Sequence, residues 1–302
     1  MTPWPLARAG ERGAWRAAPA FARAAIVSLY DELALAPKPG LVSFVDSGSH
    51  ADMDAGTFLR SLFSLRRFFA QVAEAGADGA GFAVLEALGI AAEGRMLAAT
   101  GGVNTHRGAI FTLGLLCAAA AAVQAEGRAA GADDVRAALR ARWGPALAQR
   151  VAAAHPSNGA LAARRHGLRA AGAEAALGLP TLFEHVVPAL RAARQAGVGD
   201  RRARLHALFT AMSVLDDTNL VHRGGLAALR DAQACARRFL ADGGGLHPQA
   251  IARAQDLHLQ FVARRLSPGG SADLLAAACL LERVERMALG MRTAAVRRRV
   301  VW

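Results

Sequence analysis

The sequence contains very little lysine and asparagine. Among its 36 basic residues a single one, Lys38, is a lysine, and the others are arginines. A lysine ammonium is a compact charge with rotatable donors, which a guanidinium does not reproduce. A sole lysine in "APKPG" therefore indicates a position that needs an ammonium group. Of the three asparagines, two (Asn104 and Asn219) lie in polar segments discussed below.

Aromatic residues are also scarce, at 6% of the chain, and there is a single tyrosine. Alanine is abundant and hydrophobic residues make up 53%, a composition that favours helices over sheets. Charged residues reach only 20%, which excludes a disordered chain or a coiled coil. No alternating run of β-branched residues is long enough to predict a strand. The composition therefore predicts an all-α protein.

Long apolar runs and paired cysteines are absent. The three cysteines are Cys117, Cys235 and Cys279, and none forms a CxxC pair, so we expect small core residues in a reducing compartment. The stretch "IFTLGLLCAAAAAV" is shorter than the roughly 18 apolar residues that suggest a membrane span, and it predicts a buried core helix. No apolar region typical of a signal peptide precedes "APAFA". We expect a cytoplasmic protein with no membrane partner.

Acidic residues are outnumbered by basic ones. The formal net charge is +12 and the isoelectric point is about 11.3, which suggests an anionic ligand or partner. Nucleic acid, an anionic membrane and polyphosphate ligands all fit the charge. However, arginine is spread over nearly every predicted helix, as expected of solvated helix faces. A basic nucleic-acid-binding protein remains an alternative, but no known nucleic-acid motif supports it.

Apolar periodicity predicts about ten helices in one domain. Residues 1–18 are predicted to form a flexible N-terminal arm, and residues 19–302 an all-helical catalytic domain. No linker rich in proline, glycine or serine divides the chain. The predicted helices span 20–35, 55–75, 81–99, 107–126, 133–153, 180–196, 200–215, 225–241, 248–266 and 271–290.

The polar residues concentrate in the connections between these helices, where we expect the active site. The connections span 36–57, 100–110, 163–177, 215–226 and 266–275. Three of them contain glycine-rich helix starts: "GGVNTHRGAI", "HRGGL" and "PGGSAD". Free backbone N–H groups at the positive end of a helix dipole suit a phosphate. Neither a GxxxxGK[ST] motif nor a GxGxxG after a strand is present, so P-loop and Rossmann sites are excluded.

Carboxylates form a second group in these connections. Mg²⁺ takes a few carboxylates together with waters and substrate phosphates. Asp54 and Asp273 could instead cap helices. Asp217 is predicted at the C-terminal edge of a helix, where a negative charge is unfavourable, so a functional role is favoured. Three histidines lie in polar connections, but no paired Cys/His spacing predicts zinc. They are His50, His106 and His222.

Four segments together resemble the signature segments of triphosphoribosyl-dephospho-CoA synthases. The resemblance covers roughly residues 20–290, in the same order and separation. It implies a transferase that joins ATP and 3′-dephospho-CoA into 2′-(5″-triphosphoribosyl)-3′-dephospho-CoA and releases adenine. The segments are "LALAPKPGLVSFVDSGSHADMDAGTF", "TGGVNTHRGAIFTLGLL", "DDTNLVHRGG" and "PGGSADLLAA".

The resemblance also implies partners. The product is the precursor of the prosthetic group of an acyl carrier protein, so that carrier and its phosphoribosyl transferase are indirect partners. Family members serve citrate lyase or malonate decarboxylase, and the long unfused chain favours the malonate decarboxylase branch. We expect Mg²⁺ with ATP as the cofactor, a homodimer as an open possibility, and no nucleic acid as partner.

Residue roles follow from this chemistry. Cleavage of the N-glycosidic bond gives the ribose oxocarbenium character, which carboxylates stabilise. Asp54, Asp217 and Asp273 are predicted as metal ligands or stabilising groups, and Asp52 or His50 as the base. The predicted substrate-binding residues are Lys38, Asn104, Thr105, His106, Arg107, Asn219, His222, Arg223, Gly269, Gly270 and Ser271. The main alternative is a Mg²⁺-dependent hydrolase of ADP-ribosyl N-glycosidic bonds, which uses water as the acceptor.

Overall fold

The computed structural model describes residues 9–153 and 165–299, and within these it contains helices and no strand. The prediction of an all-α fold is therefore confirmed. The helices are α1 (Ala9–Ala34), α2 (Ala55–Ser64), α3 (Arg66–Ala77), α4 (Phe82–Thr100), α5 (Arg107–Ala125), α6 (Ala132–Ala153), α8 (Ala171–Ala176), η1 (Thr181–Val186), α9 (Val187–Gln195), α10 (Asp200–Val214), α11 (Thr218–Ala241), η2 (Gly244–Leu246), α12 (Ala250–Ala263) and α13 (Gly269–Arg299).

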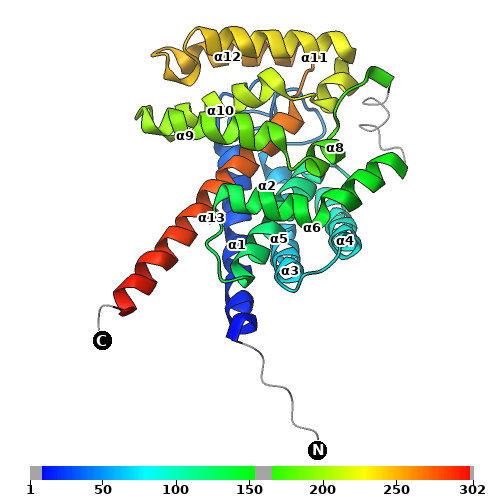
Figure 1. Ribbon diagram of the computed structural model, residues 1–302. Coiled ribbons are helices and arrows are strands. Elements are labelled where there is room, and N and C mark those ends of the chain that lie inside the picture. The colour runs from blue at the N-terminus through cyan, green and yellow to red at the C-terminus, as the bar shows by residue number, and fades with distance from the viewer. Residues whose placement is uncertain (1–8, 154–164, 300–302) are drawn as a thin grey trace, which may run out of the picture.

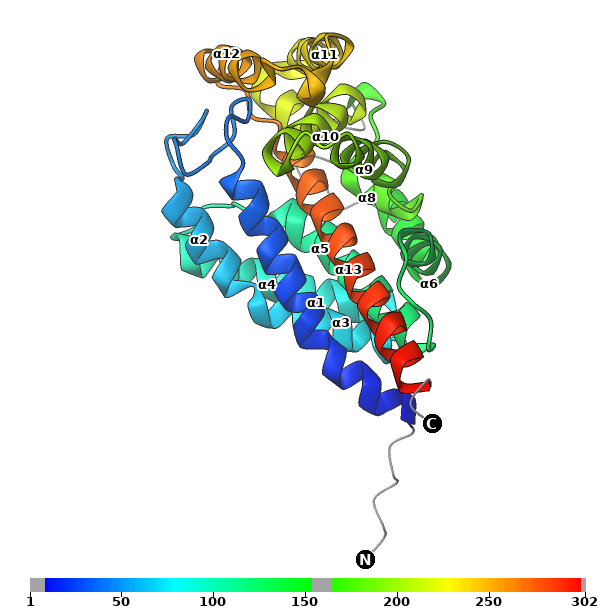
Figure 2. The same ribbon diagram turned by 90° about the vertical axis from the view of Figure 1, so that its left-hand side faces the viewer.

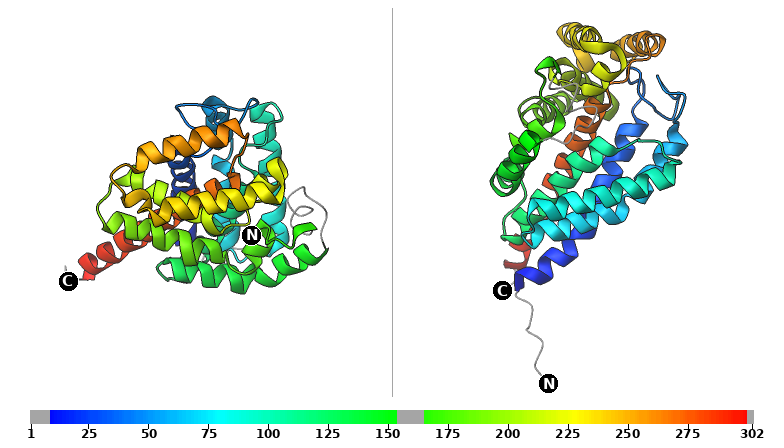
Figure 3. Two further views of the ribbon diagram at one scale, coloured as in Figure 1. Left: turned by 90° about the horizontal axis from the view of Figure 1, so that it is seen from above. Right: turned by 90° about the vertical axis from the view of Figure 1, so that its right-hand side faces the viewer.

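Three long helices form the centre of the bundle. α1 and α13 run side by side, and α5 packs against both, with α3 on its other flank (Figures 1 and 2). α10 lies against the N-terminal half of α13, and α11 and α12 lie across that end of the molecule (Figure 3). The polar connections 36–54 and 101–106 reach the same end. Helix starts and loops from distant parts of the sequence therefore meet there.

Small residues allow α3 and α5 to approach closely. A Cβ atom on Gly76 would lie 2.2 Å from the Ala118 carbonyl oxygen, and one on Gly114 would lie 2.8 Å from the Phe68 ring. Among the described helices, α5 is the one long and apolar enough to cross a membrane, but most of it is buried inside the bundle. Its alanine-rich sequence is that of a core helix, as predicted.

Several predicted helix boundaries differ from the structure. The predicted helix 55–75 is broken at buried Leu65, so that α2 packs on α4 while α3 packs on α1 and α5. The predicted helix 180–196 opens with the π-turn η1, because Pro188 has no N–H to continue the α-helical ladder. The short helix α8 was not predicted.

Two boundaries bear on function. α1 begins at Ala9, inside the segment predicted as an arm, and residues 1–8 lie outside the described residues. α11 begins at Thr218 and bends at Gly224 and Gly225, whose backbones are not helical. Asn219, His222 and Arg223, predicted to lie in a loop, therefore occupy the first turns of a helix.

Candidate functional site

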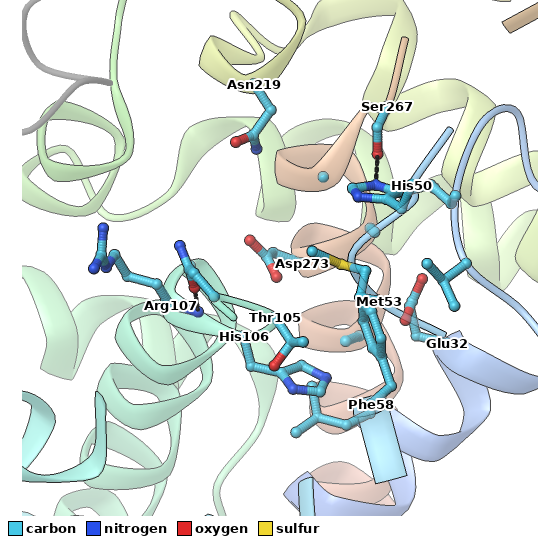
Figure 4. A pocket seen from close by; sticks show the side chains of 18 of the residues that line it. Glu32, His50, Met53, Phe58, Thr105, His106, Arg107, Asn219, Ser267 and Asp273 are labelled. Carbon is cyan, nitrogen blue, oxygen red and sulfur yellow. Dashed lines mark hydrogen bonds between the residues drawn. The ribbon is translucent and has the colours of Figure 1, made fainter. Parts of the chain in front are cut away.

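A cavity of about 210 Å³ opens at the end of the bundle where the polar connections meet (Figure 4). Its wall comes from the C-terminal half of α1, the segment 41–58, the start of α5, the first turns of α11 and the start of α13. The lining residues used below are Glu32, His50, Met53, Phe58, Asn104, Thr105, His106, Arg107, Asn219, His222, Arg223, Ser267, Gly269 and Asp273. Ten of these were predicted as site residues from the sequence.

Glu32 is a buried carboxylate in this wall, and Lys38 holds it. The Lys38 ammonium donates hydrogen bonds to Glu32 Oε1 at 2.6 Å and to the Glu32 carbonyl oxygen at 2.7 Å. The Lys38 side chain is fully buried and does not line the cavity. Burial lowers the pKa of Lys38, and Glu32 opposes that shift. The sole lysine is therefore placed as the counter-ion of Glu32, and its position does not support direct contact with a phosphate.

Asp273 is a second carboxylate in the cavity, contributed by the N-terminal part of α13. Burial raises its pKa well above the usual range, and the negative charges of Glu32 and Asp217 add to that shift. The Ala109 backbone N–H in the first turn of α5 partly offsets it. Space for the carboxylate depends on Gly108, because a Cβ atom there would lie 2.0 Å from Asp273 Oδ2.

His50 belongs to segment 41–58 and lies at the rim of the cavity, where that segment meets α11. Its Nε2 lies 2.9 Å from Ser267 Oγ, and the Arg223 guanidinium donates to its Nδ1 at 3.0 Å. Burial lowers the pKa of His50, and the nearby charge of Arg223 adds to this effect. The imidazole is therefore neutral near pH 7. Asp52, the alternative candidate base, lies 3.7 Å from His50 Nδ1 but is largely exposed and does not line the cavity.

Cationic and amide groups lie on the side of the cavity nearest α5 and α11. Arg107 opens α5 and pairs with Glu93, and its backbone N–H donates to Asn104 Oδ1 at 3.2 Å. Asn219 extends from the first turn of α11 toward Gly269, where a Cβ atom would lie 2.9 Å from its amide nitrogen. Arg107, Asn219 and Asp273 all line the cavity, and Figure 4 shows Arg107 and Asn219 on its left and upper sides. His222 and Arg223 complete this side.

Asp217 joins two helix starts instead of lining the cavity. It caps α11 by accepting from the Asn219 N–H at 3.1 Å, and it accepts from both the N–H (2.9 Å) and the hydroxyl (3.0 Å) of Ser271 in α13. Gly270 packs directly on this carboxylate. Asp217 is 1% exposed, and burial raises its pKa. The predicted residues Asp217, Gly270 and Ser271 therefore support the site from behind.

The predicted metal group of Asp54, Asp217 and Asp273 is not assembled. Asp54 is exposed, caps α2 through hydrogen bonds from the Thr57 N–H (2.7 Å) and hydroxyl (2.8 Å), and does not line the cavity. Within the described part of the chain, no three His, Cys, Asp or Glu side chains converge as a ready metal site. The two carboxylates that share the cavity are Glu32 and Asp273. Sequence reasoning treated Asp54 as a possible cap, which is the role it has here.

Sequence reasoning also missed Ser61, Met53, Phe58 and Ser267. Glu32 carried a usable signal, since it is a lone acid on an apolar helix face close to the sole lysine. Ser61 and Ser267 carried none, because their partners lie in connections that are distant in the sequence.

Comparison with known proteins supports a shared chemistry. Residues 18–290 match the CitG family, described as ATP:dephospho-CoA triphosphoribosyl transferase. The chain belongs to this family. It is therefore a transferase of the triphosphoribosyl-dephospho-CoA synthase type. The match includes every helix that contributes to the cavity.

Individual relatives agree. A probable 2-(5''-triphosphoribosyl)-3'-dephosphocoenzyme-A synthase from Pseudomonas fluorescens (strain Pf0-1) is 42% identical over 87% of this chain and 90% of its own length. One from Stutzerimonas stutzeri (strain A1501) is 42% identical over 90% of this chain and 94% of its own. One from Acinetobacter calcoaceticus is 39% identical over 85% of this chain and 88% of its own length. No solved structure matches the chain.

Proposed function

We propose that the chain transfers the 5-triphosphoribosyl group of ATP to the 2′-hydroxyl of 3′-dephospho-CoA in this cavity. The bond between C1″ of the ATP ribose and N9 of adenine breaks, and a bond from C1″ to O2′ forms. Membership of the family carries the proposal, and the cavity supplies what the reaction needs. Two carboxylates, Glu32 and Asp273, stand on its walls with cationic groups beside them.

The carboxylates suit the positive charge that develops on the ribose. Negative groups fixed near a sugar carbon stabilise oxocarbenium character without reorganisation. Lys38 holds Glu32 in position, and Asp273 faces it from α13. We assign both to stabilisation of the reacting ribose, so Asp273 keeps the role proposed for it from the sequence.

The triphosphate is retained through the reaction and needs an anion site. The helices α5, α11 and α13 all begin at the cavity, where the positive ends of their dipoles favour an anion. Arg107, Arg223 and Asn219 add side-chain donors there. We place the triphosphate on this side, with His222 at its edge. Arg223 would then turn from His50 toward the phosphates.

The cavity also fits Mg²⁺ supplied with the nucleotide. Mg²⁺ prefers hard oxygen ligands and is bound in proteins by one or two carboxylates plus phosphates and water. Asp273 and Glu32 are the carboxylates available, and the triphosphate supplies the remaining oxygens. When bound, the ion neutralises phosphate charge. The described residues do not offer a complete ligand set by themselves, so the ion would arrive with ATP.

His50 is our candidate for the base that takes the proton from the 2′-hydroxyl. Its lowered pKa keeps it neutral at pH 7, as a base must be. Release of Nδ1 by Arg223, as the guanidinium binds phosphate, would free a lone pair for that proton. ATP binding would in this way free His50 to accept the proton.

The direct test is to incubate the protein with ATP, Mg²⁺ and 3′-dephospho-CoA and to separate the products by liquid chromatography with mass detection. We expect free adenine together with a dephospho-CoA adduct heavier by one triphosphoribosyl unit. Adenine with free ribose 5-triphosphate would instead identify the hydrolase alternative. If neither set of products appears, the assignment of these substrates is wrong.

We further propose that the product serves an acyl carrier protein of the malonate decarboxylase type and that the enzyme acts in the cytoplasm. The basic, bundle-forming sequence without paired cysteines is compatible with the second part of this proposal. Transfer of the adduct by a phosphoribosyl transferase to either carrier protein would separate the malonate decarboxylase and citrate lyase branches. Sedimentation analysis would show whether a homodimer forms.

A further inference from the structure

A chain of hydrogen bonds fixes the ring of His106. The Thr105 hydroxyl donates to Ser61 Oγ at 2.6 Å, and Ser61 Oγ lies 2.6 Å from His106 Nδ1. Because Ser61 accepts from Thr105, we assign its own proton to the contact with Nδ1, the arrangement in which each hydroxyl of the chain donates once. The imidazole proton is therefore on Nε2. Ser61 is fully buried on α2, so this arrangement does not compete with solvent.

The ring is uncharged. Burial lowers the pKa of His106 to about 3, and the nearby Lys38 ammonium contributes to that shift. His106 is therefore a neutral donor throughout the range in which enzymes work. It differs in this from Arg107 and Arg223, which carry positive charge on the other side of the cavity.

The donor has no partner. His106 is 3% exposed and lines the cavity, yet its Nε2 makes no hydrogen bond within the described residues. A buried N–H that is left unpaired is unfavourable, and native proteins keep few of them. An unpaired donor in a cavity wall points to a ligand atom that accepts from it.

The surroundings of His106 are apolar and flat. The Phe58 ring meets the imidazole edge to face, with 4.9 Å between the ring centroids. Met53 lies beside Phe58, and both are on the opposite side of Asp273 from Arg107 (Figure 4). An aromatic base with ring-nitrogen acceptors fits such a wall. A phosphate does not, since the side offers one neutral donor, and the nearby Lys38 ammonium is buried and paired with Glu32.

We propose that His106, oriented by Ser61 and Thr105, donates a hydrogen bond from Nε2 to a ring nitrogen of the adenine that leaves ATP, in a pocket formed with Phe58 and Met53. The inference rests on the proposed function and adds the position of the leaving group. It revises the expectation that His106 and Thr105 orient ribose and phosphates. Thr105 becomes a positioning residue.

The hydrogen bond assists departure without itself transferring a proton. As the C1″–N9 bond breaks, its electron pair passes to the purine ring, and the negative charge spreads over the ring nitrogens. A donor placed at one of them stabilises that charge more in the transition state than in bound ATP. The 2′-hydroxyl proton goes to the base, and the departed adenine takes up a proton from water.

The test compares ATP with 3-deaza-ATP and 7-deaza-ATP, in each of which one ring nitrogen is replaced by CH. In His106→Phe we expect kcat/KM for ATP to fall about 10- to 100-fold, the range for removal of one transition-state donor. The analogue that lacks the contacted nitrogen should be slowed in the wild-type protein and hardly slowed further by the variant. His106→Gln retains an N–H donor and should recover part of the loss. Exposed His185→Phe is the matched control.

Ser61→Ala tests the positioning chain. It leaves His106 in place but removes the group that directs its proton, so discrimination between ATP and the same analogue should shrink. If His106→Phe slows ATP and both analogues equally, the donor role is wrong while the function stands. Discrimination found instead with deaza analogues of 3′-dephospho-CoA would assign the pocket to the acceptor's adenine and overturn the proposal. A wild-type protein that releases no adenine would overturn the function and this inference together.

Discussion

Glu32 and Asp273 face the same cavity from different helices, and their surroundings differ. Glu32 has an ammonium at 2.6 Å, whereas Asp273 has two negative charges near it and a single backbone donor. The ammonium beside Glu32 has no counterpart beside Asp273, so the two carboxylates are held in different ways. Each residue therefore allows a separate experiment.

Asp273→Asn should stabilise the fold while reducing transfer. A carboxyl whose pKa is raised by folding binds its proton more tightly in the folded state, so stability falls as pH rises from the usual Asp range to the raised value. The asparagine removes this loss, worth about 1.4 kcal/mol for each unit of pKa shift. We expect a higher Tm than wild type at pH 7, a difference that vanishes near pH 4, and a transfer rate at least about 100-fold lower. Identical pH profiles of Tm would contradict the raised pKa.

Lys38→Met should lower the free energy of unfolding by more than the small change in side-chain size would suggest. Removal of one member of a buried ion pair leaves the other charge uncompensated, at a cost of about 3–5 kcal/mol. The double variant Glu32→Gln/Lys38→Met should recover most of that loss. Urea unfolding of the wild type, the two single variants and the double variant measures the coupling. Equal losses in the single and double variants would show that Lys38 serves something other than Glu32.

At the scale of elements, the site is built mainly from the starts of helices. The helices α5, α11 and α13 begin at the cavity, and α2 places Phe58 and Ser61 beside His106. The starts are held together by side chains that do not line the cavity. Helix starts are therefore where small changes should affect substrate binding.

Asp217→Ala should loosen α11 and α13 together. It removes the cap of one helix and the acceptor for Ser271 on the other, at an expected cost of about 2 kcal/mol or more. The KM for ATP should rise because Asn219 and Gly269 lose their common support. The neighbour Asp216, which accepts from the Arg169 N–H, provides the matched control in Asp216→Ala. Equal effects of the two variants would remove the special role of Asp217.

Gly108→Ala should reduce transfer without unfolding the protein. The added methyl would lie 2.0 Å from Asp273 Oδ2, so the carboxylate must move away from the start of α5. We expect a loss of rate of about 10-fold or more, since small misplacements at a reacting centre have large effects. Gly94→Ala in α4, where the new methyl meets no atom within 4 Å, is the control and should raise stability by about 0.5–1 kcal/mol. Equal rates in both variants would show that Asp273 can shift without consequence.

At the scale of the whole molecule, the charge of +12 matches a site for two polyanionic substrates. A basic protein attracts anions over distances set by the Debye length. The same charge led to the nucleic-acid alternative, but the chain belongs to a transferase family and its cavity has the size of a small-molecule subsite. We therefore expect the charge to serve substrate capture.

Increasing ionic strength should weaken substrate binding more than it slows the chemical step. A change from about 0.1 M to 1 M salt shortens the Debye length from about 10 Å to about 3 Å. We expect the apparent KM for ATP and for 3′-dephospho-CoA to rise several-fold, with a smaller change in kcat. Steady-state kinetics in KCl, compared with an uncharged osmolyte, measures the effect. A KM that does not respond to salt would mean that local contacts alone bind the substrates.

Much of this architecture could be read from the sequence by itself. Helical periodicity, a property of neighbouring residues, predicted the all-α class, the core helix α5 and most helix positions. The long motifs indicated the family and placed Asn104, His106, Arg107, Asn219 and Asp273 in one site, and the structure brings these five to one cavity. Local chemistry also foresaw Asp54 as a possible cap.

Only the tertiary structure decided how these groups are used. It buried Lys38 against Glu32, turned Asp217 toward two helix starts and joined Ser61 to His106. Each of these pairings links residues whose proximity depends on how helices pack, or on which face of a helix is buried. Residue type and spacing along the chain do not contain that information. A carboxylate that contacts substrate and one that supports the cavity wall can have the same sequence surroundings.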